Sequence, residues 1–195
     1  TDSRRILTAS RDNTARIWDT RTAKPVAILA KHRRAVNNAV FSADGRRILT
    51  ASDDYTAQLW DADGKPVATL AGHTRAVNSA VFSADGRHIL TASYDKTARL
   101  WDADAAHIAT LAGHTDSVHS AVFSADGRRI LTASDDHTAR LWDADGKLVA
   151  TLAGHTDKVW SAGFSADGRH ILTASWDERA RLWDAKGTPV ATLEG

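Results

Sequence analysis

A unit of about 41 residues recurs along the whole chain, and this repetition constrains the fold more than any other feature of the sequence. Five Trp-Asp pairs begin at residues 18, 60, 101, 142 and 183, so successive pairs are separated by 42, 41, 41 and 41 residues. Every unit also carries the run Ile-Leu-Thr-Ala-Ser. A repeat of this length is typical of architectures in which each unit is one supersecondary element and the core forms between neighbouring units.

The pattern within one unit predicts four short strands. In the third unit, residues 77–82 form an apolar strand, and Asp85-Gly86 supplies residue types that tolerate the positive φ of a tight hairpin. Residues 89–93, 97–101 and 107–111 read as the second, third and fourth strands. A four-stranded unit of this kind has apolar residues on both faces, so its neighbours must cover it.

The combination of Gly-His, as in Gly113-His114, with Trp-Asp at this period resembles the WD-repeat family over the whole chain. The resemblance implies an all-β fold, a β-propeller of four-stranded antiparallel blades. Thr1 aligns with Ala43, so the chain enters at the second strand of its first blade. We therefore expect five blades with strand A of the first missing, in a single propeller or propeller fragment spanning 1–195. The expected blades are about 1–30, 31–71, 72–112, 113–153 and 154–195.

The resemblance also implies a buried hydrogen-bonded tetrad in each blade, which ties the loop between blades to the second and third strands. The matching residues are His32, Ser52, Asp54 and Trp60; His73, Ser93, Asp95 and Trp101; His114, Ser134, Asp136 and Trp142; and His155, Ser175, Asp177 and Trp183. The first unit has no preceding histidine, and His32 follows Lys31 where later units have glycine. The first blade is therefore expected to be the weakest.

Serine, histidine and aspartate are also the residues of a hydrolytic triad. A triad needs one pocket with one oxyanion site, whereas this set recurs with every blade. We therefore predict a structural role and no catalytic residue. Thr91 and Ser93 point to the same face of their strand, and the serine is assigned to the tetrad because it is closer to the aspartate.

Function is expected where the repeats differ. The position before the turn aspartate is Arg11, Asp53, Tyr94, Asp135 and Trp176, and the position after the first-strand valine is Asn37, Asn78, His119 and Trp160. The resemblance places both on the rim of the propeller's top face, where partners commonly dock. The predicted partner-binding residues are Tyr94, His119, Trp160, Trp176, Asp53 and Asp135, because large aromatic groups make good hot spots. Packing of the two tryptophans on one another or on the next blade's edge is an equally open alternative.

The composition argues against several kinds of partner. Twenty-five basic and 24 acidic residues give a net charge of +1, which is too weak to steer nucleic acid or an anionic membrane. The chain has no cysteine, and no apolar run approaches the roughly 18 residues of a membrane span. We expect no cofactor, no metal and no nucleic-acid or membrane partner. Without a signal-peptide pattern, a cytoplasmic location is expected.

The leading hypothesis is a non-catalytic scaffold that binds a protein or peptide on the top rim. The near-identical repeats are similar to those of bacterial WD-repeat arrays. Because the chain begins with Thr1 and has no methionine, an engineered or excised fragment that self-assembles through open blade edges is the alternative. WD-repeat blades are shaped for rings of about seven, so five blades are expected to pair with a second copy, lie within a longer chain or close as a strained ring. A hydrolase ranks third.

Overall fold

The computed structural model describes residues 4–194, which form five separate antiparallel sheets. The first sheet contains β1 (Arg5–Ala9), β2 (Ala15–Asp19) and β3 (Pro25–Leu29). The second contains β4 (Val36–Phe41), β5 (Arg47–Ser52), β6 (Ala57–Asp61) and β7 (Pro66–Leu70). The third contains β8 (Val77–Phe82), β9 (His88–Ser93), β10 (Ala98–Asp102) and β11 (His107–Leu111). The fourth contains β12 (Val118–Phe123), β13 (Arg129–Ser134), β14 (Thr138–Asp143) and β15 (Leu148–Ala153). The fifth contains β16 (Val159–Phe164), β17 (His170–Ser175), β18 (Arg179–Asp184) and β19 (Pro189–Glu194).

Each sheet is one blade, and we call the strands of a complete blade A to D in chain order. Blades two to five have all four strands in sequential order, and blade one has strands B, C and D only. The A strands of successive blades contact one another, so they line the inside of the assembly. The predicted all-β fold of antiparallel propeller blades, with strand A of the first missing, is confirmed.

Tight turns and a β-bulge shape strand A. After strand A of blade three, Gly86 has φ +68° and its amide donates to the carbonyl of Ser83 at 2.9 Å, as expected for the Asp-Gly turn. Within the strand the register shifts between Val77 and Ser79, so Asn78 is the extra residue. The bulge residues of the other complete blades are Asn37, His119 and Trp160. A bulge interrupts the alternation of the strand, which turns these side chains away from the core face.

Each pair of neighbouring blades encloses one apolar layer. Blade three contributes leucines and alanines of strands B to D, including Leu90 and Leu111, and we call this side of a blade its trailing face. Blade four covers it with valine, alanine, isoleucine and tryptophan, including Ile130 and Trp142, and this side is the leading face. The same layer recurs at the other blade junctions. The core of the molecule is therefore a series of layers between blades, and no blade has a core of its own.

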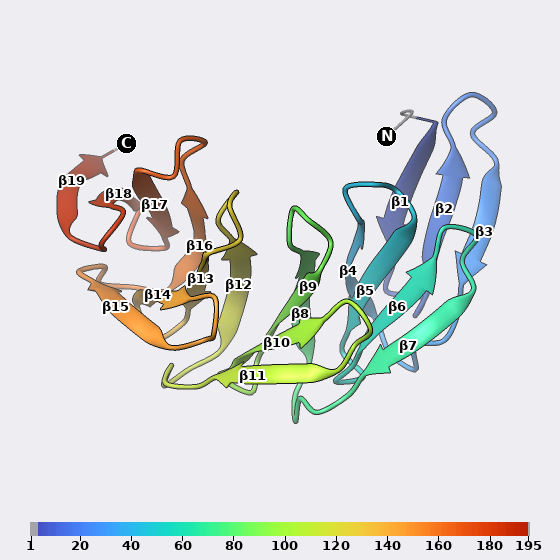
Figure 1. The fold of residues 1–195 in the computed structure, drawn as a ribbon, viewed down its shortest axis with the longest axis horizontal. Coiled ribbons are helices and arrows are strands. Elements are labelled where there is room, and N and C mark those ends of the chain that lie inside the picture. The colour runs from blue at the N-terminus through green and yellow to red at the C-terminus, as the bar shows by residue number, and fades with distance from the viewer. Residues whose placement is uncertain (1–3, 195) are drawn as a thin grey trace.

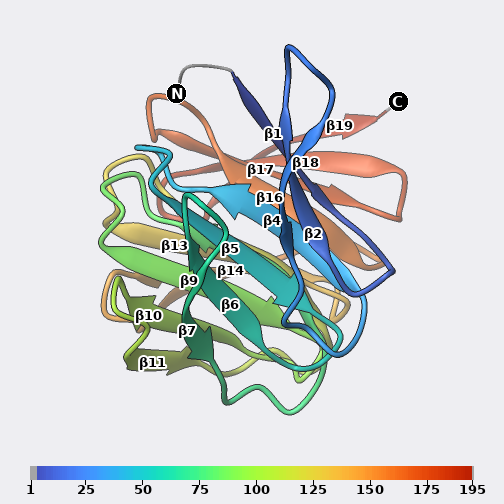
Figure 2. The same ribbon diagram turned by 90° about the vertical axis from the view of Figure 1, so that its right-hand side faces the viewer.

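The blades follow one another around an open arc, with blade one at one end and blade five at the other (Figure 1). Figure 2 looks onto the N-terminal end of this arc, where β1 and β2 face the viewer. The trailing face of blade five is correspondingly bare: Leu172 is 46% exposed, whereas Leu131 at the same position of blade four is fully buried. The expected alternative of a strained closed ring is not the arrangement seen. Within residues 4–194, no helix has the length and apolar character needed to cross a membrane.

Candidate functional site

In each complete blade, a histidine and an aspartate from the loops meet a threonine of strand B and a tryptophan of strand C. In blade three, His73 Nδ1 lies 2.8 Å from Asp95 Oδ2, and His73 Nε2 lies 2.8 Å from Thr91 Oγ1. The indole N–H of Trp101 donates to the same threonine hydroxyl at 3.0 Å. Blades two, four and five repeat these contacts at closely similar distances through Thr50, Thr132 and Thr173. The network joins the loop between blades to two strands.

The assignment of serine to these tetrads is wrong, and threonine takes its place. Ser93 accepts a hydrogen bond from the backbone amide of Asp95 at 3.1 Å and donates to the carbonyl of Ala76 at 2.9 Å. Ser52, Ser134 and Ser175 likewise bond backbone groups of the turn and the loop. The reason is register: Thr91 pairs with Arg99, two residues from Trp101, whereas the serine lies at the end of the strand.

The hydrogen bonds of a tetrad form one continuous chain. The indole N–H of Trp101 donates to the Thr91 hydroxyl, which contacts His73 Nε2, and His73 Nδ1 contacts the Asp95 carboxylate. Burial would raise the pKa of Asp95, but hydrogen bonds from His73 and Thr97 outweigh it and hold that pKa well below its usual range. The tetrad therefore carries one buried negative charge with its own donors.

Blade one has the threonine, tryptophan and aspartate of a tetrad but no histidine. Trp18 still donates to Thr8 Oγ1, at 2.8 Å. Asp12 Oδ2, which would face the histidine, instead accepts Arg16 Nη2 at 2.6 Å. In the complete blades the threonine hydroxyl is fully buried, whereas Thr8 is exposed. The arginine thus replaces one of the two contacts that a histidine makes.

The change from glycine to Lys31 in blade two is matched by a second change. Gly72 has φ +145°, and a Cβ there would lie 2.5 Å from Nη1 of Arg99, whose guanidinium rests on the glycine. Blade two has Gln58 in place of that arginine, and Gln58 is buried and accepts a hydrogen bond from Thr69 at 2.8 Å. The ammonium of Lys31 donates to the same threonine at 3.3 Å. The two substitutions form one alternative packing of the loop between blades.

The two variable positions of the repeat, treated separately in the sequence, form a pair within each complete blade. Asn37 donates to Asp53 at 2.7 Å in blade two. In blade three, Tyr94 donates to Asn78 at 3.4 Å. The corresponding pairs are His119 with Asp135 at 2.7 Å and Trp160 with Trp176, whose ring centroids lie 5.9 Å apart. We call these eight residues the rim row.

Four residues of the rim row, Tyr94, His119, Trp160 and Trp176, form a continuous row of ring contacts that crosses from blade to blade, and we call it the aromatic ladder. Tyr94 meets His119 edge to face, with centroids 5.5 Å apart, and His119 stacks on Trp160 at 4.4 Å. Both tryptophans stay accessible, since Trp160 is 48% and Trp176 59% exposed. The tryptophans therefore pack on one another, as one of the two sequence-based alternatives predicts, and each still presents surface to solvent.

Charged groups flank the ladder. Asp135 Oδ1 accepts from His119 Nε2 at 2.7 Å, and its other oxygen lies 3.4 Å from the ammonium of Lys158. That ammonium also lies 5.3 Å from the ring centroid of Trp176. Burial raises the pKa of the Tyr94 hydroxyl, and the carboxylates of Asp53 and Asp135 raise it further. The ladder has an acidic side at Tyr94 and a basic side at Trp176.

The family model described as WD domain, G-beta repeat, matches five segments that cover most of the chain: residues 1–19, 23–61, 64–102, 106–143 and 146–184. The chain belongs to the WD-repeat family. No curated protein sequence matches it. WD repeats imply a protein-interaction scaffold in general, and WD-repeat propellers are generally non-catalytic.

The geometry of these WD repeats does not assemble a hydrolytic triad. Ser52, Ser93 and Ser134, which lie beside the tetrads, are fully buried, and they bond backbone groups while the histidine Nε2 contacts threonine. A nucleophile must instead contact its base and be reached by substrate. In the part of the chain that the structure describes, no group of three or more His, Asp or Glu side chains is placed to hold a metal ion.

Lys158 is a rim residue of this WD-repeat chain that the sequence analysis missed. The position before the strand A valine is Ala35, Ala76 and Ser117 in the other complete blades, so only blade five has a charged residue there. This difference between repeats is the signal that identifies it. Its contacts with Trp176 and Asp135 couple blade five to blade four.

Proposed function

We propose that this WD-repeat chain is a non-catalytic scaffold that binds a protein or peptide segment on the rim row. The ligand would contact Tyr94, His119, Trp160 and Trp176, with Asp53 and Asp135 beside them. One observation carries the proposal: two stacked tryptophans remain about half exposed on a surface where blade two has the small polar pair Asn37–Asp53. Accessible aromatic groups held rigid by their neighbours are typical of binding hot spots.

The flanking charges indicate the chemistry of the ligand. The tryptophan faces favour an apolar or aromatic side chain, because they bury large area with few rotamers to freeze. At the Tyr94 end of the ladder, the nearby carboxylates favour a basic group on the ligand. A short segment with an apolar anchor and a neighbouring lysine or arginine fits both requirements.

A peptide-display selection against the purified chain tests this proposal. Clones enriched on the wild type are measured against the double variant Trp160→Ala/Trp176→Ala. Loss of a hot spot costs about 2 kcal/mol or more, so we expect the affinity to fall at least about 30-fold. The melting temperature should stay nearly unchanged, because both side chains lie outside the layers between blades.

Val67→Ala provides the matched control, since Val67 is an equally exposed apolar residue on the outer strand of blade two. It should leave peptide affinity unchanged. A large drop in melting temperature for the double tryptophan variant would mean that the pair is structural. Enriched peptides that bind the double variant as tightly as the wild type would also contradict rim binding.

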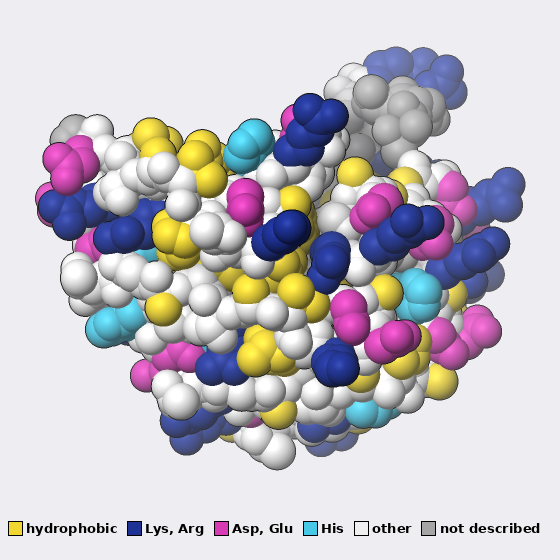
Figure 3. Space-filling view, turned by 60° about the vertical axis from the view of Figure 1, so that its left-hand side comes forward, with side chains coloured by type: hydrophobic (Ala, Val, Ile, Leu, Met, Phe, Trp, Pro, Cys, Tyr) yellow, Lys and Arg dark blue, Asp and Glu magenta, His cyan; other side chains and the backbone are white. Residues whose placement is uncertain are grey.

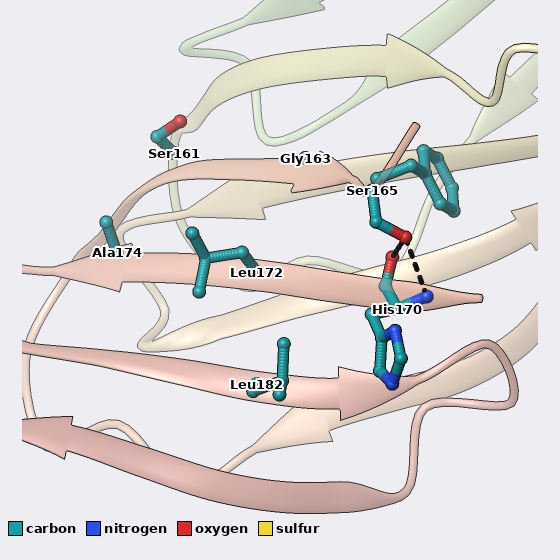
Figure 4. Close-up of a pocket in the computed structure, with 8 residues that line it drawn as sticks. Ser161, Gly163, Ser165, His170, Leu172, Ala174 and Leu182 are labelled. Carbon is teal, nitrogen blue, oxygen red and sulfur yellow. Dashed lines mark hydrogen bonds between the residues drawn. The ribbon is translucent and has the colours of Figure 1, made fainter. Parts of the chain in front are cut away.

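Self-association through open blade surfaces is a second candidate, favoured by the trailing face of blade five. This face has a hollow of about 410 Å³ lined by Gly163, Leu172, Ala174 and Leu182, among others. Figure 4 shows the two leucines on neighbouring strands with Gly163 of β16 beside them. The other complete blades have valine at the glycine position. Figure 3, which brings this end of the arc forward, shows hydrophobic groups between charges of both signs.

A further inference from the structure

Lys158 places a positive charge directly beside the aromatic ladder. In each complete blade, a backbone hydrogen bond holds the residue before the strand A valine next to the second residue of the rim pair. The amide of Trp176 donates to the Lys158 carbonyl at 3.0 Å, as the amide of Asp135 donates to the Ser117 carbonyl at 2.9 Å in blade four. Blades two and three have alanine at this position. The repeat therefore fixes where the lysine lies, and among the complete blades only blade five uses the position for a cation.

The ammonium of Lys158 lies in a small cation site. Its nitrogen is 3.4 Å from Asp135 Oδ2 and 5.3 Å from the ring centroid of Trp176. A carboxylate oxygen and the face of a tryptophan both attract a positive group. The Asp135 side chain is only 11% exposed, and its other oxygen lies 2.7 Å from His119 Nε2. Lys158 is thus the group that meets the remaining oxygen of this carboxylate.

The lysine is held in this site only weakly. Its side chain is 40% exposed, and its 3.4 Å contact is longer than a charge-assisted hydrogen bond. An ion pair this open to water contributes little. Its charge also acts at Tyr94: burial and the carboxylates of Asp53 and Asp135 raise the pKa of the hydroxyl, whereas Lys158 lowers it. The lysine therefore offsets part of the negative charge that a basic ligand would meet.

We propose that Lys158 is an internal competitor for this cation site, and that an arginine of the bound peptide displaces it from Asp135 and Trp176. The inference rests on the proposed function, since it identifies the basic group of the ligand and the residue that sets the preference for it. A guanidinium is flat, stacks on aromatic faces and is more weakly hydrated than an ammonium, so arginine is better suited to the site than the lysine. The displaced ammonium moves into water. Lys158 thereby lowers the affinity of the rim for basic ligands.

Two peptides that differ only in the basic group test this competition. Acetyl-Leu-Arg-Gly amide and acetyl-Leu-Gln-Gly amide are titrated into the wild type and Lys158→Ala, while NMR follows the indole N–H signals of Trp160 and Trp176. Alanine is the residue of blades two and three, so this variant should fold. We expect it to raise the ratio of arginine-peptide to glutamine-peptide affinity about two- to fivefold, the factor that one exposed ion pair contributes.

Displacement can also be observed at the lysine itself. The ammonium lies beside the Trp176 ring, whose ring current should shift the NMR signal of the adjacent carbon of Lys158. This signal is identified by its absence from Lys158→Ala. Saturation with the arginine peptide should move it toward the position of a lysine free in water, whereas the glutamine peptide should not.

Lys147→Ala is the matched control, because it removes the same charge from the exposed turn between β14 and β15. It should leave the affinity ratio unchanged. An unchanged ratio in Lys158→Ala, an equal rise in Lys147→Ala, or a Lys158 signal that stays in place while the arginine peptide binds would each overturn the competition and leave the rim as a peptide site. Failure of both peptides to bind either chain, or binding that persists in Trp160→Ala/Trp176→Ala, would instead contradict the rim site and this inference with it.

Discussion

At the scale of single residues, the threonine at the centre of each tetrad is expected to contribute more to the free energy of unfolding than Thr8, the exposed threonine at the same position of blade one. In blade four, Thr132 bonds both His114 and Trp142 and is fully buried. The substitution Thr132→Val keeps the shape of the side chain and leaves two buried polar groups without a partner. Each such group costs about 1–3 kcal/mol, so the free energy of unfolding should fall by at least this amount in a urea titration.

Thr8→Val is the matched control for that measurement. Thr8 bonds a single tryptophan and is exposed, so water replaces the lost contact and the cost should stay below about 1 kcal/mol. Equal losses for Thr132→Val and Thr8→Val would mean that the histidine contact adds nothing to stability.

Acid should weaken the tetrads in a defined range of pH. Burial would raise the pKa of Asp177, but hydrogen bonds from the Thr156 amide, His155 and the Arg179 amide lower it from 3.8 to about 2. A group whose folded pKa is depressed contributes stability above its unfolded pKa, and this is lost as the pH falls through the folded value. The free energy of unfolding should therefore be level near neutral pH and fall between about pH 4 and pH 2.

Asp177→Asn should be less stable than the wild type near pH 6 and show a shallower fall in acid. Asp145→Asn, which removes the same charge from an exposed turn, should keep the full slope. These slopes come from unfolding titrations repeated across the pH range. An unchanged acid slope for Asp177→Asn would exclude this carboxylate as a source of the pH dependence.

Most of each tetrad was predictable, but the choice between threonine and serine was not. The positions that recur in every complete unit single out one histidine, one aspartate and one tryptophan, whereas Thr91 and Ser93 both recur and share one face of the strand. Proximity in sequence favours the serine. The contact depends on the cross-strand register, which places Thr91 beside Arg99 and so within reach of the tryptophan, and the sequence pattern does not specify that register.

At the scale of the element, the loop between blades exists in two packings that should not mix. Blades three to five combine glycine with arginine, and blade two combines Lys31 with Gln58. Gly72→Lys alone places a side chain against the Arg99 guanidinium at a backbone φ that favours glycine, so it should destabilise the chain by about 1–3 kcal/mol.

Adding Arg99→Gln to Gly72→Lys should restore part of the loss, because it creates the pairing of blade two. Unfolding of the two single variants and the double variant gives a coupling energy, which we expect to be about 0.5–3 kcal/mol and favourable. Additive effects would show that the covariation between these positions has no physical basis in their contact.

The sequence predicted which positions form the rim, but not that their side chains pair with one another. Differences between repeats identified both variable positions, but their pairing depends on the bulge in strand A. The spacing of Val77 and Ala80, two buried residues three apart, departs from the two-residue period of a regular strand and was the available signal. An unbroken strand would turn Asn78 and its equivalents to the opposite face.

At the scale of the whole molecule, the blades behave as a stack whose ends are unlike its middle. The five-blade count and the missing strand follow from the repeat, whereas the open arc does not, because closure depends on the angle between blades. Leu172 and Leu193 of blade five are 46% and 50% exposed, while Leu131 and Leu152 at the same positions are covered by the next blade. The same apolar surface is thus buried at each internal junction and bare at one end.

We therefore expect copies of the chain to associate through this trailing face, with a native mass that rises with concentration in analytical ultracentrifugation. Covering a leucine stabilises a contact by about 1.5–3 kcal/mol, so Leu172→Lys or Leu193→Lys should raise the dissociation constant at least tenfold. Val67→Lys, at an exposed valine outside the trailing face, supplies the control and should leave association unchanged. A mass that stays near 21.0 kDa at all concentrations would show that blade five tolerates its bare face, and that the arc is a stable monomer.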